Sequence, residues 1–230
     1  MAFETTNIES YSARVAQAPP ADIGRDRFYR RAGKSWLDLA LAIVMAPVVV
    51  PLILLLWLFT RCDSGPGFYV QSRVGRGGRV FRCYKLRTMV VDADRRLAEL
   101  CAQDPERARE WRENQKLADD PRITRLGRFL RATSLDELPQ YFNVLKGDMS
   151  FVGPRPYMLD QHDMYRAAGG TAYGRMRPGI TGPWQLDGRG ETPFADRVGF
   201  DEAYYRAQSL RGDLRMLLRT IGVVINRTGT

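Results

Sequence analysis

Two adjacent acids, Asp136 and Glu137, lie shortly before a Gly-Pro-Arg-Pro segment that contains Arg155. A carboxylate can serve as a nucleophile or as a Mg²⁺ ligand, and an arginine can hold two phosphate oxygens at once. A carboxylate that attacks a phosphate must overcome like-charge repulsion, so this chemistry requires a dication or fixed cations nearby. The two acids and Arg155 are therefore candidates for a phosphate-transfer site.

A purely structural interpretation of the acids is also open. Ser134 and Glu137 have the spacing of a capping box, in which each residue would hydrogen-bond the backbone of the other at the start of a helix. Asp136 has no part in that motif. Its side chain would project from the first helical turn, where the helix dipole attracts anions.

Lys85 and Arg87 are further candidates for phosphate binding. The segments FYVQSRVG (68–75) and GRVFRCYKLRTM (78–89) have strand composition and meet at the turn GRGG, which predicts a β-hairpin. Residues two apart on a strand point to the same face, so Lys85 and Arg87 would lie side by side. Taken singly, each basic residue is more often a surface charge than a ligand.

The overall charge favours anionic partners. The 230-residue chain has 35 Lys and Arg against 26 Asp and Glu, a net charge of +9, which suits phosphates, nucleic acid or anionic lipid. Cys62, Cys83 and Cys101 form no paired spacing, which argues against a disulfide framework and a zinc site. His162 is the single histidine, which disfavours Ser-His-Asp chemistry.

An uncharged apolar run, LALAIVMAPVVVPLILLLWLF (39–59), is long enough to cross a bilayer. Basic residues flank it on both sides, which is typical of cytoplasmic ends. Pro47 and Pro51 each remove a helical hydrogen bond and predict a bend. We therefore predict a re-entrant helix-break-helix over 34–60 with both ends at the cytoplasmic face. A membrane-crossing anchor with a prolyl kink is the alternative, and it would place the C-terminal domain outside the cell.

These patterns predict an α+β, mainly helical fold, with interfacial amphipathic helices and a small β-hairpin around the active site. The expected organisation is a mobile tail over 1–33, the re-entrant membrane helix, and a cytoplasmic, membrane-associated catalytic domain over 61–230. The charged run 92–118 predicts two helices separated at Asp104, which would cap the second. The segment 119–133 is amphipathic and suits either an anionic membrane surface or the domain core. Helical spacing also continues from residue 201 to the C-terminal region.

Five motifs together resemble the monotopic phosphoglycosyl transferases, also called bacterial sugar transferases, of the type that initiates exopolysaccharide synthesis. The resemblance runs from about Lys34 to the C-terminal helix. Its landmarks are SGPGFYVQSRVG (64–75), YKLRTM (84–89), DDPRITRLGRFLRATSLDELPQ (119–140), NVLKGDMSFVGPRP (143–156) and RPGITGPWQLDGR (177–189).

The resemblance implies an enzyme at the cytoplasmic face of the bacterial inner membrane, in contact with its phospholipid. It would transfer a sugar 1-phosphate from a UDP-sugar to undecaprenyl phosphate. Asp136 would attack the sugar-linked phosphate, UMP would leave, and undecaprenyl phosphate would accept the phosphosugar from a covalent aspartyl intermediate. Glu137 would complete the acidic dyad.

The resemblance also implies a cofactor and several binding residues. Mg²⁺ would be bound by Asp136 and Glu137, while Arg155, assisted by Lys85 and Arg87, would hold phosphate. Arg177 and Thr181 would help form the nucleotide or sugar pocket, although the glycines around them could serve only a tight loop.

The chain departs from the family pattern at three places. The usual Ser-Pro at the helix break is Ala46-Pro47 here, so the serine hydroxyl that could satisfy freed backbone is absent. The usual Lys-Arg before the membrane helix is Lys34-Ser35, with Asp38 retained as a possible partner for a basic residue. Asp187 replaces a small polar residue and could bear on sugar choice.

A hexose 1-phosphate is the expected group transferred, because the short form and the EWRENQKL stretch (110–117) look like exopolysaccharide-initiating members. A homodimer is compatible with the sequence. The competing hypothesis is a membrane-tethered basic protein that binds nucleic acid or anionic lipid without catalysis. No helix-turn-helix, RRM or stacked aromatic set occurs in the sequence, which argues against a nucleic-acid partner.

Overall fold

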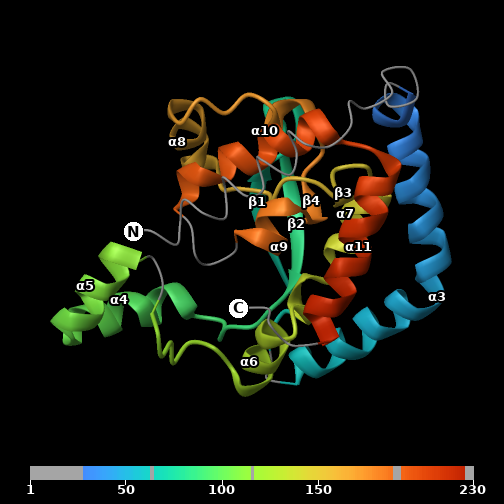
Figure 1. Ribbon diagram of the computed structural model, residues 1–230. Coiled ribbons are helices and arrows are strands. Elements are labelled where there is room, and N and C mark those ends of the chain that lie inside the picture. Colours follow the sequence, from blue (N-terminus) through green and yellow to red (C-terminus); the bar gives the residue numbers. More distant parts are fainter. Residues whose placement is uncertain (1–27, 63–64, 115–116, 189–192, 226–230) are drawn as a thin grey trace.

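The computed structural model describes residues 28–62, 65–114, 117–188 and 193–225 (Figure 1). Most of the predicted tail therefore lies outside the described residues. The chain is already helical from Phe28, and a π-helical turn, Tyr29–Gly33, leads directly into the apolar helix α3 (Lys34–Arg61). Residues 28–33, which the sequence placed in the tail, are therefore helical.

Helices dominate the described part of the chain, as predicted. The helices are α3 (Lys34–Arg61), α4 (Ala93–Gln103), α5 (Pro105–Asn114), α6 (Arg125–Ala132), α7 (Gln140–Leu145), α8 (His162–Ala167), α9 (Pro183–Asp187), α10 (Arg197–Ala207) and α11 (Leu210–Ile225). The strands are β1 (Phe68–Val74), β2 (Val80–Leu86), β3 (Ser150–Val152) and β4 (Gly179–Thr181).

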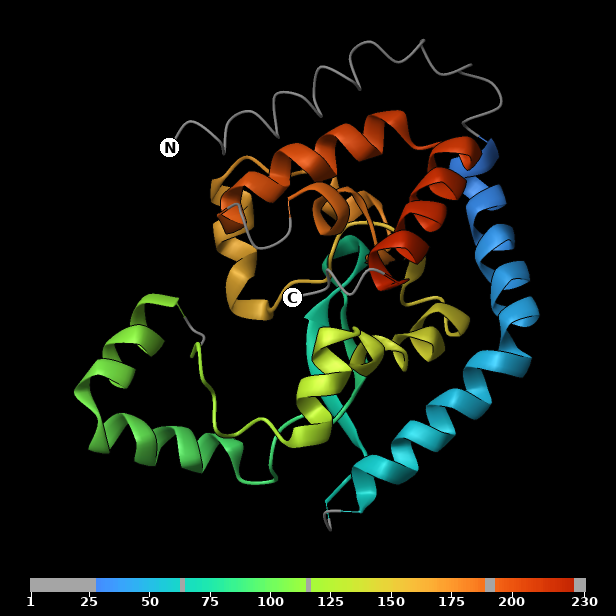
Figure 2. The same cartoon turned by 60° about the horizontal axis from the view of Figure 1, so that its bottom comes forward.

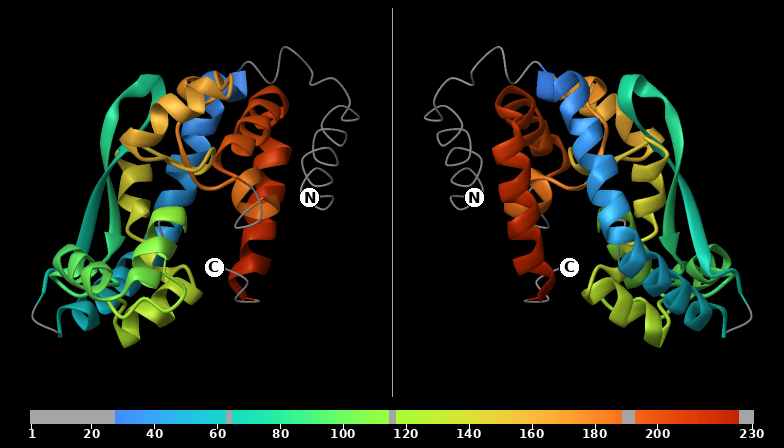
Figure 3. Two further views of the ribbon diagram at one scale, coloured as in Figure 1. Left: turned by 90° about the vertical axis from the view of Figure 1, so that its left-hand side faces the viewer. Right: turned by 90° about the vertical axis from the view of Figure 1, so that its right-hand side faces the viewer.

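The strands form two small sheets. β1 and β2 pair antiparallel, with Phe68 opposite Leu86 and Val74 opposite Val80, and this long ribbon stands at one edge of the molecule in Figure 3. β3 and β4 pair in parallel, with Ser150 opposite Gly179. The second pair was not predicted, because strands of three residues are too short to show an alternating pattern.

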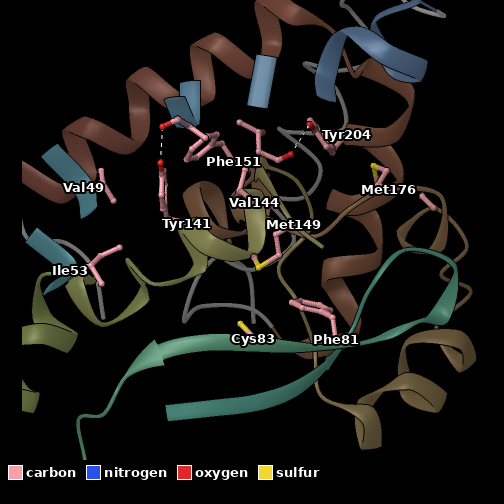
Figure 4. Close-up of a cluster of buried hydrophobic side chains, with 13 residues drawn as sticks. Val49, Ile53, Phe81, Cys83, Tyr141, Val144, Met149, Phe151, Met176 and Tyr204 are labelled. Atoms are coloured by element: carbon pink, nitrogen blue, oxygen red, sulfur yellow. Dashed lines mark hydrogen bonds between the residues drawn. The ribbon is translucent and has the colours of Figure 1, made fainter. Parts of the chain in front are cut away.

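Helix α3 continues through Pro47 and Pro51 as one helix and bends part-way along its length (Figures 1 and 2). Pro47 has no N–H for the carbonyl of Ile43, four residues earlier. The Tyr141 hydroxyl of α7 donates to the neighbouring carbonyl of Ala42 at 2.7 Å (Figure 4). A tyrosine from another element therefore brings a hydroxyl to the backbone beside the bend, where the sequence has no serine.

Contacts along α3 attach it to the rest of the fold. At its start, Lys34 pairs with Asp213 of α11 at 2.5 Å. Further on, Asp38 accepts hydrogen bonds from the Ser150 hydroxyl and the Phe151 N–H, each at 3.0 Å. The exposed side of α3 is strongly apolar; it includes Ile43, Val44, Val48, Leu54, Leu55 and Leu58.

The hydrophobic core joins α3 to the elements around the acidic dyad (Figure 4). It brings together Ala42, Val49 and Ile53 of α3, Phe81 and Cys83 of β2, Tyr141 and Val144 of α7, Phe151 and Val152 of β3, and Tyr204 of α10. α7 begins shortly after the dyad. The dyad is therefore placed by an element that packs directly against α3.

The peripheral helices follow the predicted boundaries. Asp104 Oδ1 accepts from the N–H groups of Glu106 and Arg107 at 2.9 and 3.2 Å, and so caps α5 as expected. α4 and α5 project from the body on the side away from α3 (Figure 2). α6 is amphipathic, since Leu130 is fully buried while the neighbouring Phe129 is half exposed. The C-terminal helical region is divided into α10 and α11.

Candidate active site

The acidic dyad lies in a short 3₁₀ turn, Leu135–Glu137, between α6 and α7. Ser134 immediately before it has φ 56°, in the left-handed region, and its side chain makes no cap hydrogen bond. The Glu137 N–H instead donates to the Ser134 backbone carbonyl at 3.2 Å. The capping-box interpretation is therefore wrong, because the left-handed residue turns the chain into a tight 3₁₀ bend instead of starting an α-helix.

The Glu137 carboxylate faces two cations. Its Oε1 accepts from Lys85 Nζ at 2.7 Å and from Arg155 Nη2 at 3.2 Å. Lys85 Nζ also lies 3.9 Å from Asp136 Oδ2. Four of the predicted site residues, from three separate segments of the chain, therefore meet at one point.

This cluster borders a small depression in the surface. Arg73 of β1, Cys83 and Lys85 of β2, Glu137, Gln140 of α7, Arg155, Pro156 and Gly179 line it. Three of these side chains, Arg73, Lys85 and Arg155, are cationic, which suits a polyanionic ligand such as a diphosphate.

Burial shapes the chemistry of Asp136. The residue is only 9% exposed, and burial raises the pKa of its carboxyl above the ordinary value. Lys85 opposes this shift and the neighbouring Glu137 adds to it. A poorly solvated carboxylate is more basic than an ordinary aspartate, and a more basic oxygen is a better nucleophile once it has lost its proton.

The segment that carries Arg155 packs backbone to backbone against β4. A Cβ on Gly153 would lie 2.5 Å from the carbonyl oxygen of Arg177, and a Cβ on Gly179 would lie 2.1 Å from the Gly153 nitrogen. No side chain fits at either position. The glycines of GPRP and RPGITG thus allow the two loops to approach each other.

Arg87 does not join the cluster. β2 ends at Leu86, and the Arg87 guanidinium donates to the backbone carbonyls of Thr60 at 2.8 Å and Pro66 at 2.7 Å. The two side chains therefore do not lie side by side at one site as expected, since Lys85 contacts the dyad and Arg87 contacts these two carbonyls. Arg87 instead holds the C-terminal end of α3 against the start of β1.

Arg177 and Thr181 also make contacts with the scaffold. Arg177 Nη2 pairs with Asp38 of α3 at 2.8 Å, which confirms that Asp38 has a basic partner. Thr181 in β4 is buried and accepts from the Thr220 hydroxyl of α11 at 2.8 Å. Asp187 forms a bidentate ion pair with Arg219 at 2.6 and 3.2 Å. All three residues connect β4 and α9 to neighbouring helices.

Sequence reasoning missed Arg73, which the register of the ribbon places on the Lys85 face. Tyr69 pairs with Lys85 and Arg73 pairs with Phe81, so alternate residues of both strands share that face. Gln140, at the start of α7, was also missed. Both residues fall within the quoted motifs, yet their position beside the dyad depends on pairing and packing.

The two acids fit the donor set of a magnesium site that the substrate completes. Among the described residues, no three His, Cys, Asp or Glu side chains gather in one place. Mg²⁺ is commonly held by one or two carboxylates, with phosphate oxygens and water filling the remaining positions. Glu137 lines the cationic depression and the buried Asp136 precedes it in the same 3₁₀ turn, so the two acids could supply two hard oxygen ligands and a diphosphate the rest.

Comparisons with known proteins identify the family. The model of the bacterial sugar transferase family matches residues 29–227. The chain is 44% identical over 203 residues to an undecaprenyl-phosphate galactose phosphotransferase of Salmonella typhimurium, a match that covers 88% of this chain and 42% of that protein. It is 41% identical over 220 residues to the exopolysaccharide production protein ExoY of Sinorhizobium fredii, covering 95% of this chain and 97% of that protein.

A third relative is named for glucose instead of galactose. The chain is 40% identical over 198 residues to a UDP-glucose:undecaprenyl-phosphate glucose-1-phosphate transferase of Caulobacter vibrioides, covering 82% of this chain and 68% of that protein. The family match extends from the π-helical turn before α3 through α11, and so includes α3, the dyad and the loops beside the dyad. This chain belongs to the bacterial sugar transferase family.

Proposed function

We propose that this protein transfers a sugar 1-phosphate from a UDP-sugar to undecaprenyl phosphate and releases UMP, as the first step of exopolysaccharide or capsule assembly. The observation that carries the proposal is the meeting of Asp136, Glu137, Lys85 and Arg155 at one cationic depression. The names of the relatives specify galactose or glucose, which supports a hexose 1-phosphate as the transferred group.

The first half of the reaction uses Asp136 as the nucleophile. An oxygen of its carboxylate bonds to the phosphorus attached to the sugar, and the bond from that phosphorus to the bridging oxygen breaks. UMP leaves with the bonding electron pair, and an aspartyl-phosphosugar remains. The raised pKa of Asp136 supports this role, because burial makes its carboxylate more nucleophilic.

The second half of the reaction regenerates the free Asp136 carboxylate. A phosphate oxygen of undecaprenyl phosphate attacks the same phosphorus, the bond to the Asp136 oxygen breaks, and the carboxylate leaves with its electron pair. Lys85 and Arg155 lie beside the acidic dyad, where they would offset the charge of the transferred phosphate in both halves. When bound by Asp136 and Glu137, Mg²⁺ would neutralise part of the diphosphate charge.

The membrane arrangement proposed is a re-entrant α3 at the cytoplasmic face of the inner membrane. Tyr29–Arg61 forms a single helical stretch, which by its length and composition is long enough and apolar enough to cross a membrane. A helix that crossed completely would place its ends on opposite sides of a roughly 30 Å hydrocarbon core. Here the first turn pairs with α11 through Asp213 and the last turn is held by Arg87, so both ends contact one folded domain.

The decisive experiment for the chemistry is covalent trapping. Purified full-length protein in lipid nanodiscs with Mg²⁺ is incubated with a UDP-sugar carrying ³²P in the sugar-linked phosphate. We expect the protein to become labelled, and undecaprenyl phosphate to remove the label. Asp136→Asn should abolish both labelling and UMP release, because the amide is a poor nucleophile.

The control variant is Asp119→Asn, an exposed acid in the same motif as the dyad. It should label and turn over like the wild type. Undiminished UMP release by Asp136→Asn, or kinetics that require both substrates to be bound before any UMP is released, would contradict the proposal.

A further inference from the structure

The loop that carries Arg155 is held through a run of backbone carbonyls. Pro154 and Pro156 have no N–H, so this loop has few donors of its own. Its carbonyl oxygens accept hydrogen bonds from three other elements, β4, α10 and β1. Pro154 O accepts from Gly179 N–H at 2.8 Å, Arg155 O from Arg197 Nη2, Pro156 O from Arg73 Nη1 at 3.2 Å, and Tyr157 O from Val74 N–H at 3.1 Å.

Arg197 of α10 makes the contact to Arg155 from the protein interior. It is 2% exposed, and Asp201 Oδ2 lies 3.6 Å from its Nε. Its guanidinium carbon is 5.1 to 5.9 Å from the centres of five aromatic rings: Phe194, Tyr157, Trp184, Tyr165 and Tyr173. A buried arginine is costly unless it is paired and hydrogen-bonded. Here Asp201 and the aromatic rings stabilise the buried Arg197, and its guanidinium donates to the backbone carbonyl of Arg155.

Arg73 makes the matching contact from the other side. Its Nη2 donates to Gln71 Oε1 on the same strand at 2.6 Å, while its Nη1 reaches the Pro156 carbonyl. The buried Arg197 of α10 and the partly buried Arg73 of β1 therefore donate to consecutive carbonyls of the loop. An arginine has the length and the fixed fork of donors that such a contact requires.

We infer that Arg197 and Arg73 are positioning residues that hold the Gly153–Pro156 loop so that the Arg155 side chain is aimed at the dyad. Arg197 is too deeply buried to reach a substrate, so any effect it has on the reaction must pass through this loop. Misplacing a phosphate-binding group by about 1 Å can lower a rate on the order of 100-fold. The expected loss of UMP release rests on the proposed function, whereas the expected loosening of the loop does not.

A double-mutant cycle tests the inference. Arg197→Lys keeps a buried cation beside Asp201 and the aromatic rings but has a shorter reach and lacks the guanidinium fork. We expect it to lower kcat/KM for UMP release by about tenfold in the wild-type background and less than twofold in an Arg155→Ala background. Arg73→Lys should follow the same pattern more weakly, because Arg73 also lines the depression.

Arg122→Lys is the matched control. Arg122 is likewise buried, pairs with Asp120 at 2.6 Å and lies over Trp111. Within the part of the chain that the structure describes, it forms no hydrogen bond or ion pair with the loop. Its kcat/KM should stay within twofold of wild type. Equal losses for Arg197→Lys in both backgrounds, or an equal loss for Arg122→Lys, would overturn the inference, since both point to general destabilisation.

A second readout is independent of the reaction. Amide hydrogen exchange measured by mass spectrometry on peptides covering 151–158 should be faster in Arg197→Lys and Arg73→Lys than in the wild type, and unchanged in Arg122→Lys. Unchanged exchange in both arginine variants would overturn the inference even if activity fell. If exchange were faster in both variants but the wild type itself released no UMP, the positioning role would stand and the proposed function would be rejected.

Discussion

Glu137 and Asp136 are adjacent in the sequence but have different surroundings. Glu137 is held by two cationic side chains, whereas Asp136 is buried, and its nearest described cation is Lys85 at 3.9 Å. Lys85 is the residue that contacts both acids. At the residue scale it is therefore the group whose removal affects the dyad most directly.

Lys85→Met should lower kcat/KM for UMP release by about 100-fold, because a fixed cation next to the transferred phosphate is lost while the apolar part of the side chain is kept. Initial-rate assays of UMP release measure the effect. Lys146→Met is the control, since Lys146 is exposed and donates to the Tyr84 hydroxyl at 2.6 Å, away from the dyad. Equal rates for the wild type and Lys85→Met would contradict a phosphate-binding role for Lys85.

At the scale of elements, α7 connects the dyad to the bend in α3. Tyr141→Phe removes the hydrogen bond to the Ala42 carbonyl beside Pro47 while the ring stays in the core. The loss should cost about 1 kcal/mol, which corresponds to a fall of about 2 to 4 °C in Tm for a domain of this size. Thermal unfolding in detergent measures it, with Tyr69→Phe on the half-exposed face of β1 as the control. A Tm equal to that of the wild type would show that the bend does not depend on this hydroxyl.

α10 contains a buried acid that should make stability depend on pH. Burial raises the pKa of Asp201 from 3.8 to about 6, although Arg197 and Tyr165 favour its charged form and Glu202 opposes it. The folded state therefore holds the Asp201 proton more tightly than the unfolded state does. This contribution to stability is complete below about pH 3.8 and is lost as the pH rises through about 6.

Asp201→Asn should remove this titration. Between pH 4 and pH 7 the wild type should lose up to about 3 kcal/mol of unfolding free energy relative to the variant. Denaturant unfolding at a series of pH values gives the difference between the two proteins, in which other titrating groups largely cancel. Parallel stability curves over this range would contradict the raised pKa. The control Asp160→Asn changes an exposed acid, and its dependence of stability on pH should match that of the wild type.

At the scale of the whole molecule, α3 is attached to the domain at its start, near its bend and at its end. Its other side exposes branched apolar residues that suit lipid contact. If α3 is re-entrant, the segments before and after it lie on the same side of the membrane.

Cysteine labelling in intact cells tests this topology. Single cysteines are introduced at position 20 and at Arg76 in a variant that lacks Cys62 and Cys101; Cys83 is retained because it is buried in the core. Both positions should resist a membrane-impermeant maleimide until the inner membrane is permeabilised. Labelling of only one of them in intact cells would establish a helix that crosses the membrane.

The sequence by itself determined the features that depend on local chemistry. The apolar run with its two prolines, the ribbon of β1 and β2, the helix cap at Asp104 and the family motifs are all encoded by neighbouring residues. Charge and motif spacing also brought Asp136, Glu137, Lys85 and Arg155 forward as one candidate site.

Only the tertiary structure decided which polar residues reach that site. Arg87 was expected to bind phosphate beside Lys85, and Arg177 to help form the nucleotide or sugar pocket. In the fold, Arg87 donates to the Thr60 carbonyl and Arg177 pairs with Asp38. Arg73 and Arg197 became visible only after strand register and helix packing had placed them on consecutive carbonyls of one loop. The physical reason is reach: a long cationic side chain can pair with any acceptor within several ångströms, and contacts distant in sequence determine which acceptor that is.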